Sequence, residues 1–127
     1  MRHALLLLAL GGCAADGTQS TSRETESLQR ELAGRVAGEP ERCVHASQSD
    51  ALHAVDSNTI VYRRGGVVWV NRLPASCPGL RPLTTLIIEP KMGTSYCRDD
   101  LVRALEPGAT IPGPVCRIGD FVPYRKP

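Results

Sequence analysis

Several features that would assign a function at once are absent from the sequence. The apolar run near its start, Ala4–Leu10, is far shorter than the roughly 20 residues that a helix needs to cross a membrane, so it is no transmembrane anchor. No cysteine pair has the C-x-x-C spacing of a zinc site, and no glycine-rich loop carries the lysine of a phosphate-binding loop. The net charge is only +2, so the chain is mildly basic.

The first residues predict export. Arg2 and His3 precede the apolar run and small residues follow it, which is the pattern of a secretory signal over residues 1–12. The stretch Leu10-Gly11-Gly12-Cys13 resembles the lipobox of bacterial lipoproteins, where cleavage falls before a cysteine whose thiol receives a diacylglycerol. The resemblance predicts lipid attachment at Cys13, and Ala14 in place of an aspartate predicts sorting to the outer membrane, facing the periplasm. An ordinary signal peptide, or an apolar strand of the core, is the alternative.

Four further cysteines predict a disulfide framework, since an even number is typical of small exported domains. They are Cys43, Cys77, Cys97 and Cys116. The folded part, residues 43–127, is small enough for crosslinks to supplement its core. Three pairings are possible, and we favour Cys77 with Cys97, around one predicted strand, and Cys43 with Cys116, at the ends of the domain.

Residues 13–42 are polar and predict a lipid-anchored tether that is partly helical. Within "TSRETESLQRELAGRVAG", Thr21 and Glu24 fit a capping box, and Gly38 lies where a helix commonly ends. An apolar residue recurs every four positions, at Leu28, Leu32 and Val36. So narrow an apolar stripe stabilises a helix little unless the helix docks on another part of the protein. We therefore expect a spacer, and the less favoured alternatives are packing on the domain and self-association.

From Cys43 onward the pattern predicts a mostly β fold, a small antiparallel sheet or barrel-like domain of about five short strands. Residues 58–64 and 67–73 are rich in β-branched and aromatic residues and flank Gly65-Gly66, which indicates a β-hairpin. Further strands are expected over residues 83–90, 100–107 and 115–124.

The polar residues that are candidates for catalysis or metal binding have weak patterns. Four of them cluster before the hairpin, namely His45, Asp50, His53 and Asp56. Their spacing matches no defined metal site, so we expect solvated side chains, no metal and no cofactor. Cys97 with His53 would form a nucleophile pair only if the thiol were reduced. Asp99-Asp100 is interpreted as a turn cap.

Basic and aromatic residues around the hairpin form a candidate binding surface. It comprises Arg63, Arg72, Trp69 and Tyr62, with Arg64 and Arg81 nearby. Alternation along a strand allows only part of this set to converge. We expect an acidic headgroup, an envelope polysaccharide or an envelope protein as its partner. A nucleic acid is not expected for a lipid-anchored exported protein.

Four segments carry a resemblance to a known family: "CVHASQ", "NTIVYRRGGVVWVNRLPASCPGL", "YCRDDLVRAL" and "CRIGDFVPY". In order and spacing they are similar to small, mainly proteobacterial exported proteins, often lipid-anchored, described only as domain of unknown function 6491. The resemblance implies a small exported domain and brings no catalytic residues. We therefore expect a non-enzymatic envelope lipoprotein with a binding or structural role, and the alternative is a small envelope hydrolase or metal-dependent enzyme.

Overall fold

The structure of the chain is a computed structural model that describes residue 11 and residues 16–46 and 52–127. The predicted lipid site, Cys13, and Asp50 lie outside the described residues. The described residues form one helix, α1 (Asp16–Leu32), and ten strands. The strands are β1 (Val36–Ala37), β2 (Cys43–His45), β3 (Leu52–Asp56), β4 (Thr59–Arg64), β5 (Val67–Arg72), β6 (Thr85–Glu89), β7 (Ser95–Cys97), β8 (Leu101–Leu105), β9 (Cys116–Arg117) and β10 (Phe121–Arg125).

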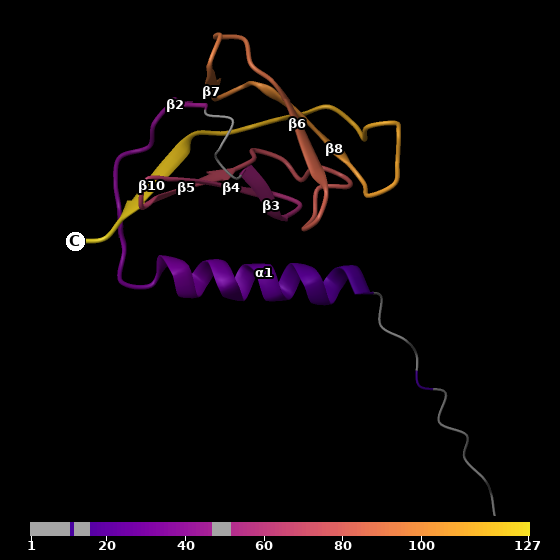
Figure 1. Cartoon of the computed structure of the whole chain (residues 1–127), viewed down its shortest axis with the longest axis horizontal. Coiled ribbons are helices and arrows are strands. Elements are labelled where there is room, and N and C mark those ends of the chain that lie inside the picture. Colours follow the sequence, from indigo (N-terminus) through magenta and orange to yellow (C-terminus); the bar gives the residue numbers. More distant parts are fainter. Residues whose placement is uncertain (1–10, 12–15, 47–51) are drawn as a thin grey trace, which may run out of the picture.

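The strands form three antiparallel sheets, and the described residues close no barrel. The largest sheet has the order β1-β10-β5-β4-β3, while β2 pairs with β7, and β6-β8-β9 forms a third sheet. Figure 1 shows α1 along one side of the five-stranded sheet and the two smaller sheets on the other side. The predicted mostly β fold, with its disulfides, is confirmed.

The predicted hairpin is confirmed as β4 and β5. Gly65 and Gly66 both have positive φ, 54° and 79°, which the tight two-residue turn requires and which glycine adopts without steric cost. Antiparallel register places Tyr62 opposite Trp69 and Arg63 opposite Val68. The hairpin thus fixes which side chains share a face of the sheet.

The later strands differ in detail from the prediction. The expected strands over residues 83–90 and 100–107 form as β6 and β8, which pair with each other. The expected strand over residues 115–124 is divided, because β9 pairs with β8 whereas β10 pairs with β5. The strands β1, β2, β3 and β7 were not predicted, since most are two or three residues long and two of them pair with segments far along the chain.

The helix is longer toward the N-terminus and ends sooner than expected. It begins at Asp16, so Thr21 lies inside it rather than at its cap, and it ends at Leu32, before Gly34 with φ 77°. The prediction of a stop at Gly38 is wrong, because the chain has already turned into β1 there. No helix among the described residues is long and apolar enough to span a membrane.

The helix does not stand free as a spacer. Leu28 is 6% exposed and packs with the inward side chains of β3, β4 and β5, and Leu32 joins at the edge of this cluster. Its members from the sheet are Val55, Val61, Val68 and Val70. The stripe therefore docks on the sheet, which was the less favoured alternative. A second, larger cluster fills the space between the sheets and contains Ile60, Val102 and Phe121.

All four cysteines form disulfides, as predicted, but the favoured pairing is wrong. The bridges join Cys43 to Cys97 and Cys77 to Cys116. Cys43 and Cys97 are directly opposite each other where β2 pairs with β7. The pairing thus follows from contacts between segments 54 residues apart in sequence. The position of two cysteines on either side of one predicted strand does not reveal such contacts.

Candidate functional site

The structure divides the predicted binding surface between the two faces of the five-stranded sheet. Tyr62 and Trp69 point to the side of the smaller sheets, where they join the larger core cluster. Arg63 and Arg72 have the opposite parity, shared with Val61 and Val70, and lie on the side of α1. The four residues therefore do not make one surface.

The two aromatic side chains serve the packing between sheets. Tyr62 is 1% exposed, and its hydroxyl donates a hydrogen bond to the His45 carbonyl at 2.7 Å. Its ring lies 5.5 Å from that of Trp69 and 6.1 Å from that of Tyr96, the latter edge to face. The indole N–H of Trp69 donates to Glu41 at 3.2 Å. Tyr62 is thus closed to a ligand.

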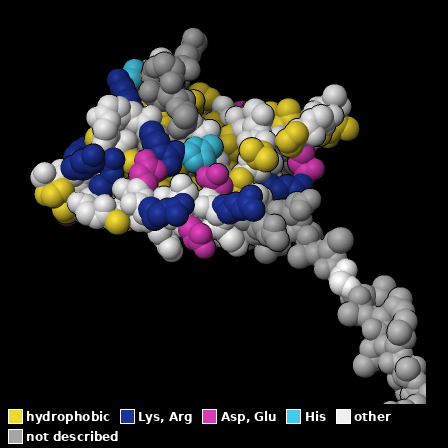
Figure 2. All heavy atoms as spheres, turned by 60° about the horizontal axis from the view of Figure 1, so that its bottom comes forward, with side chains coloured by type: hydrophobic (Ala, Val, Ile, Leu, Met, Phe, Trp, Pro, Cys, Tyr) yellow, Lys and Arg dark blue, Asp and Glu magenta, His cyan; other side chains and the backbone are white. Residues whose placement is uncertain are grey.

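Arg63 holds α1 to the sheet. Its Nε donates to the Glu31 carboxylate at 2.7 Å, its Nη2 donates to the second carboxylate oxygen, and its Nη1 lies 3.2 Å from both ring nitrogens of His53. The pKa of the Glu31 carboxyl is lowered, chiefly by the hydrogen bonds from Arg63. The pKa of His53 is also lowered, first by burial and then by the positive charge of Arg63. Figure 2 shows a histidine among basic and acidic side chains on this face.

Other charged candidates also have partners. Arg81 pairs with Glu106, and Arg64 donates to the His45 carbonyl at 3.4 Å. Asp56 accepts a hydrogen bond from the Asn58 backbone N–H at 2.8 Å, which places it in the turn before β4. Among the described residues no three His, Cys, Asp or Glu side chains are grouped to hold a metal ion.

The proposed nucleophile pair and the paired carboxylates have other roles. Cys97 is in a disulfide, so its sulfur is not a thiol that His53 can activate. Asp100 is 1% exposed, and its carboxylate accepts a hydrogen bond from the Cys97 backbone N–H at 2.7 Å. The interpretation of Asp99-Asp100 as a turn cap is thus supported at Asp100.

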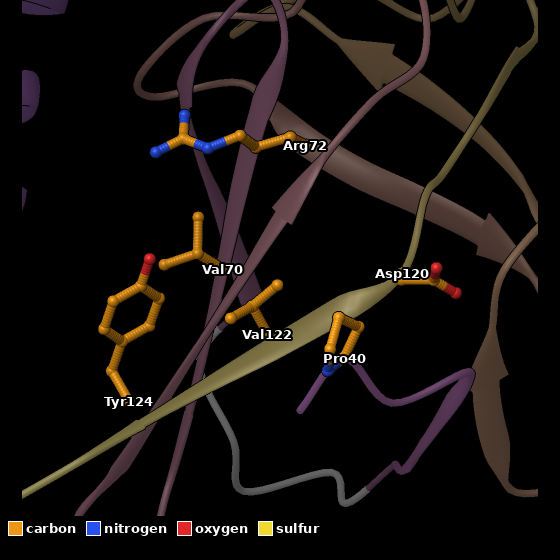
Figure 3. A pocket seen from close by; sticks show the side chains of 6 residues that line it. All are labelled: Pro40, Val70, Arg72, Asp120, Val122 and Tyr124. Carbon is orange, nitrogen blue, oxygen red and sulfur yellow. The ribbon is translucent and has the colours of Figure 1, made fainter. Parts of the chain in front are cut away.

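A hollow of about 310 Å³ lies on the α1 side of the sheet, between β5 and β10. It is lined by Pro40, Val70, Arg72, Asp120, Val122 and Tyr124 (Figure 3). Val70 and Val122 are directly opposite each other in the ladder and form its floor. We call it the β5–β10 hollow. It contains one residue of the predicted surface, Arg72.

The polar groups of the hollow lie on one side of its floor. Figure 3 shows the guanidinium of Arg72 and the hydroxyl of Tyr124 on the same side of Val70, with the carboxylate of Asp120 turned away from them. Tyr124 is opposite Val68 in the ladder, four positions before Arg72, so the two residues are about 13 Å apart along the strands. The Tyr124 side chain extends from its strand toward Arg72 (Figure 3), so one ligand on the valine floor can contact both the hydroxyl and the guanidinium.

The lining of the hollow contains one cation and one anion, Arg72 and Asp120. Asp120 pairs with Arg98 at 3.4 Å outside the lining. Arg72 is exposed and forms no hydrogen bond or ion pair with any described residue, and the Tyr124 hydroxyl likewise has no partner among them. An uncompensated guanidinium therefore stands at the rim of an apolar floor.

A close approach of the backbone shapes this region. The Asn71 side chain is fully buried and makes two hydrogen bonds to Gly119, donating to its carbonyl at 2.7 Å and accepting from its N–H at 2.8 Å. A Cβ at position 119 would lie 2.4 Å from the Arg72 carbonyl oxygen. Only glycine fits this close approach without a shift of the backbone. The two hydrogen bonds of Asn71 hold the segment before β10 against the end of β5.

Sequence reasoning missed the other residues of the hollow. The parity of "FVPY" places Val122 and Tyr124 on one face, but no sequence signal shows that β10 pairs with β5. Pro40 reaches the rim because the segment after β1 continues along β10, where Glu41 and Phe121 exchange backbone hydrogen bonds of 2.7 and 2.8 Å.

A second hollow, of about 450 Å³, lies near the Cys77–Cys116 disulfide and contains three prolines with Ser76 and Arg117. The Ser76 hydroxyl is already bonded to Ser57 at 3.1 Å. This hollow lacks an aromatic wall, so we regard the β5–β10 hollow as the better candidate site.

Comparisons with family models, curated proteins and solved structures find no match to this chain. The resemblance to domain of unknown function 6491 therefore stays a prediction.

Proposed function

We propose that the chain is a lipid-anchored, non-catalytic binding domain of the bacterial cell envelope. The observation that supports binding is the β5–β10 hollow, where the guanidinium of Arg72 has no partner among the described residues. Ligand pockets combine apolar surface with a few polar groups that orient the ligand, and this hollow has both an apolar floor and the Arg72 guanidinium.

The anchor is the predicted lipid on Cys13. Because α1 begins at Asp16 and packs on the sheet, only two residues, Ala14 and Ala15, separate the lipid site from the helix, and three peptide units join Cys13 to Asp16. A chain of that length spans at most about 11 Å. The domain would thus lie next to the membrane surface instead of being held away from it by a long tether.

Labelling with radioactive palmitate tests the anchor. The wild-type chain should incorporate label, enter the detergent phase and stay with membranes after a high-salt wash, since two or more acyl chains attach stably. Cys13→Ala should incorporate none and remain an unprocessed precursor. Label in Cys13→Ala, or none in the wild type, would contradict the lipid assignment.

Co-sedimentation tests the binding role. The purified full chain, kept in detergent micelles, is mixed with envelope saccharide freed of protein and lipid and with protein-containing membranes treated in parallel. Saturable sedimentation with the saccharide, or with the protein-containing membranes but not with protein-free vesicles of the same lipids, supports a binding domain and shows which kind of partner it has. Sedimentation with neither fraction would contradict the proposal.

A further inference from the structure

The β5–β10 hollow has the chemical features of a site for a small anionic ring. Its single unpaired charge is the guanidinium of Arg72, a planar donor that matches the two oxygens of a carboxylate. The floor, Val70 and Val122, is apolar, and the ring of Tyr124 adds an apolar wall that ends in a hydroxyl. The volume of about 310 Å³ is at the small end of the range for small-molecule pockets.

We propose that the β5–β10 hollow binds an acidic saccharide, with the sugar carboxylate on Arg72 and the apolar face of the sugar ring on Val122 and Tyr124. The proposal rests on the binding function above and names its ligand class. A pyranose ring has one face of C–H groups and an edge of hydroxyl groups, so it can cover the valine floor while it exchanges a hydrogen bond with the Tyr124 hydroxyl.

The arrangement of charge favours a carboxylate on a ring over the other anions. Asp120 pairs with Arg98 outside the lining and its carboxylate is turned away from Arg72 (Figure 3). The unpaired charge of the hollow is therefore Arg72, which suits a ligand group with one negative charge. A bare inorganic ion would reach Arg72 and leave the apolar floor in water. A neutral sugar would leave the positive charge of the Arg72 guanidinium without a negative partner.

The relative position of the Arg72 and Tyr124 side chains also favours a ligand that contacts both. The two residues start about 13 Å apart along the strands, and their side chains lie on the same side of Val70 (Figure 3). One group that is both anionic and cyclic engages both residues at once. The exposed position of Arg72 leaves the hollow open at the rim, so further sugar units of a chain can extend into solvent.

A titration with matched sugars tests the proposal. The full chain in detergent micelles is titrated with digalacturonate, with the neutral disaccharide galactobiose and with acetate, while calorimetry and the backbone amide resonances of Val122 and Tyr124 are recorded. Digalacturonate should bind at least tenfold more tightly than either control and should shift the two resonances. Raising the salt concentration should weaken binding, because the carboxylate contact is partly exposed.

Three variants locate the site. Arg72→Gln should lower the affinity for digalacturonate at least tenfold and leave the melting temperature unchanged, since the side chain is exposed and unpaired. Tyr124→Ala should also weaken binding. Arg117→Gln is the matched control, because it removes an exposed arginine from the second hollow, and it should have no effect.

Several results would overturn the proposal. Equal affinity for digalacturonate and galactobiose would show that the carboxylate is not recognised, and equal affinity for acetate would show that the ring plays no part. Loss of binding in Arg117→Gln alone would place the ligand in the second hollow. If Arg72→Gln sediments with envelope saccharide as the wild type does, the binding function stands and the assignment to the β5–β10 hollow fails; if the wild type binds neither saccharide nor membranes, both fail.

Discussion

Two substitutions should weaken the docking of α1 on the five-stranded sheet, and the expected loss of docking free energy differs between them. Leu28→Ala removes a side chain that is 6% exposed from a cluster of valines. Leucine-to-alanine changes in cores cost about 2–5 kcal/mol, and we expect about 2 kcal/mol because only one face of α1 is covered. Glu31→Gln removes the charge of the carboxylate that pairs with Arg63. The two side chains are 26% and 34% exposed, so we expect a loss of about 1 kcal/mol.

Hydrogen exchange of the α1 amides measures this docking, because local opening controls their exchange. After correction for intrinsic rates, exchange in α1 should be roughly 30-fold faster in Leu28→Ala and roughly 5-fold faster in Glu31→Gln. Amides of β4 and β5 should be much less affected. Glu26→Gln is the control, since Glu26 is exposed on the same helix, and it should leave exchange unchanged.

Acid should also lower the stability of the fold. The pKa values of His53 and Glu31 lie below their ordinary values of 6.5 and 4.5, so the folded state binds fewer protons than the unfolded state. Its stability is therefore lost as the pH falls, below about 6.5 through His53 and below about 4.5 through Glu31. His53→Gln should remove the step at the higher pH. If α1 exchanges equally fast in the wild type and in Leu28→Ala, or if Glu26→Gln has the effect of Glu31→Gln, the docking argument is wrong.

Three further predictions concern the body of the fold. Peptide mapping without reductant should recover Cys43 with Cys97 and Cys77 with Cys116; recovery of Cys77 with Cys97 would refute the strand pairing. Replacing one bridge by two serines should lower the free energy of unfolding in urea by about 4 kcal/mol, from loops of 54 and 39 residues. Gly119→Ala should cost about 1–3 kcal/mol in the same assay, since its Cβ meets the Arg72 carbonyl, and a neutral result would refute that contact.

The parts of the fold that were predicted from the sequence are those that neighbouring residues determine. The hairpin β4–β5 follows from two β-rich runs and the glycines between them, and β6 and β8 follow from runs of the same kind. The strands that were missed form differently. The two-residue strand β1 pairs with β10, some 90 residues later, and nothing in so short a segment marks it as a strand.

The same limit applies to the disulfides. Residue spacing suggested a bridge around the third predicted strand, whereas the observed bridge between Cys43 and Cys97 lies across the β2–β7 ladder. Which cysteines meet is decided by the pairing of segments distant in the sequence. The number and spacing of the cysteines therefore predict that disulfides form, but they do not predict which cysteines are joined.

The candidate site shows why strand alternation is not sufficient to find a surface. Alternation places Arg63 and Arg72 on the same face, with the valines of β4 and β5, and both residues were equally good candidates by that criterion. The difference between them comes from α1, which supplies Glu31 to Arg63 and has no described contact with Arg72. Because the narrow stripe of α1 was expected to remain free, the sequence offered no reason to separate the two. The docked helix covers one arginine and leaves the other as the unpaired charge of the β5–β10 hollow, so the position of the site depends on a contact between two segments that neither segment predicts alone.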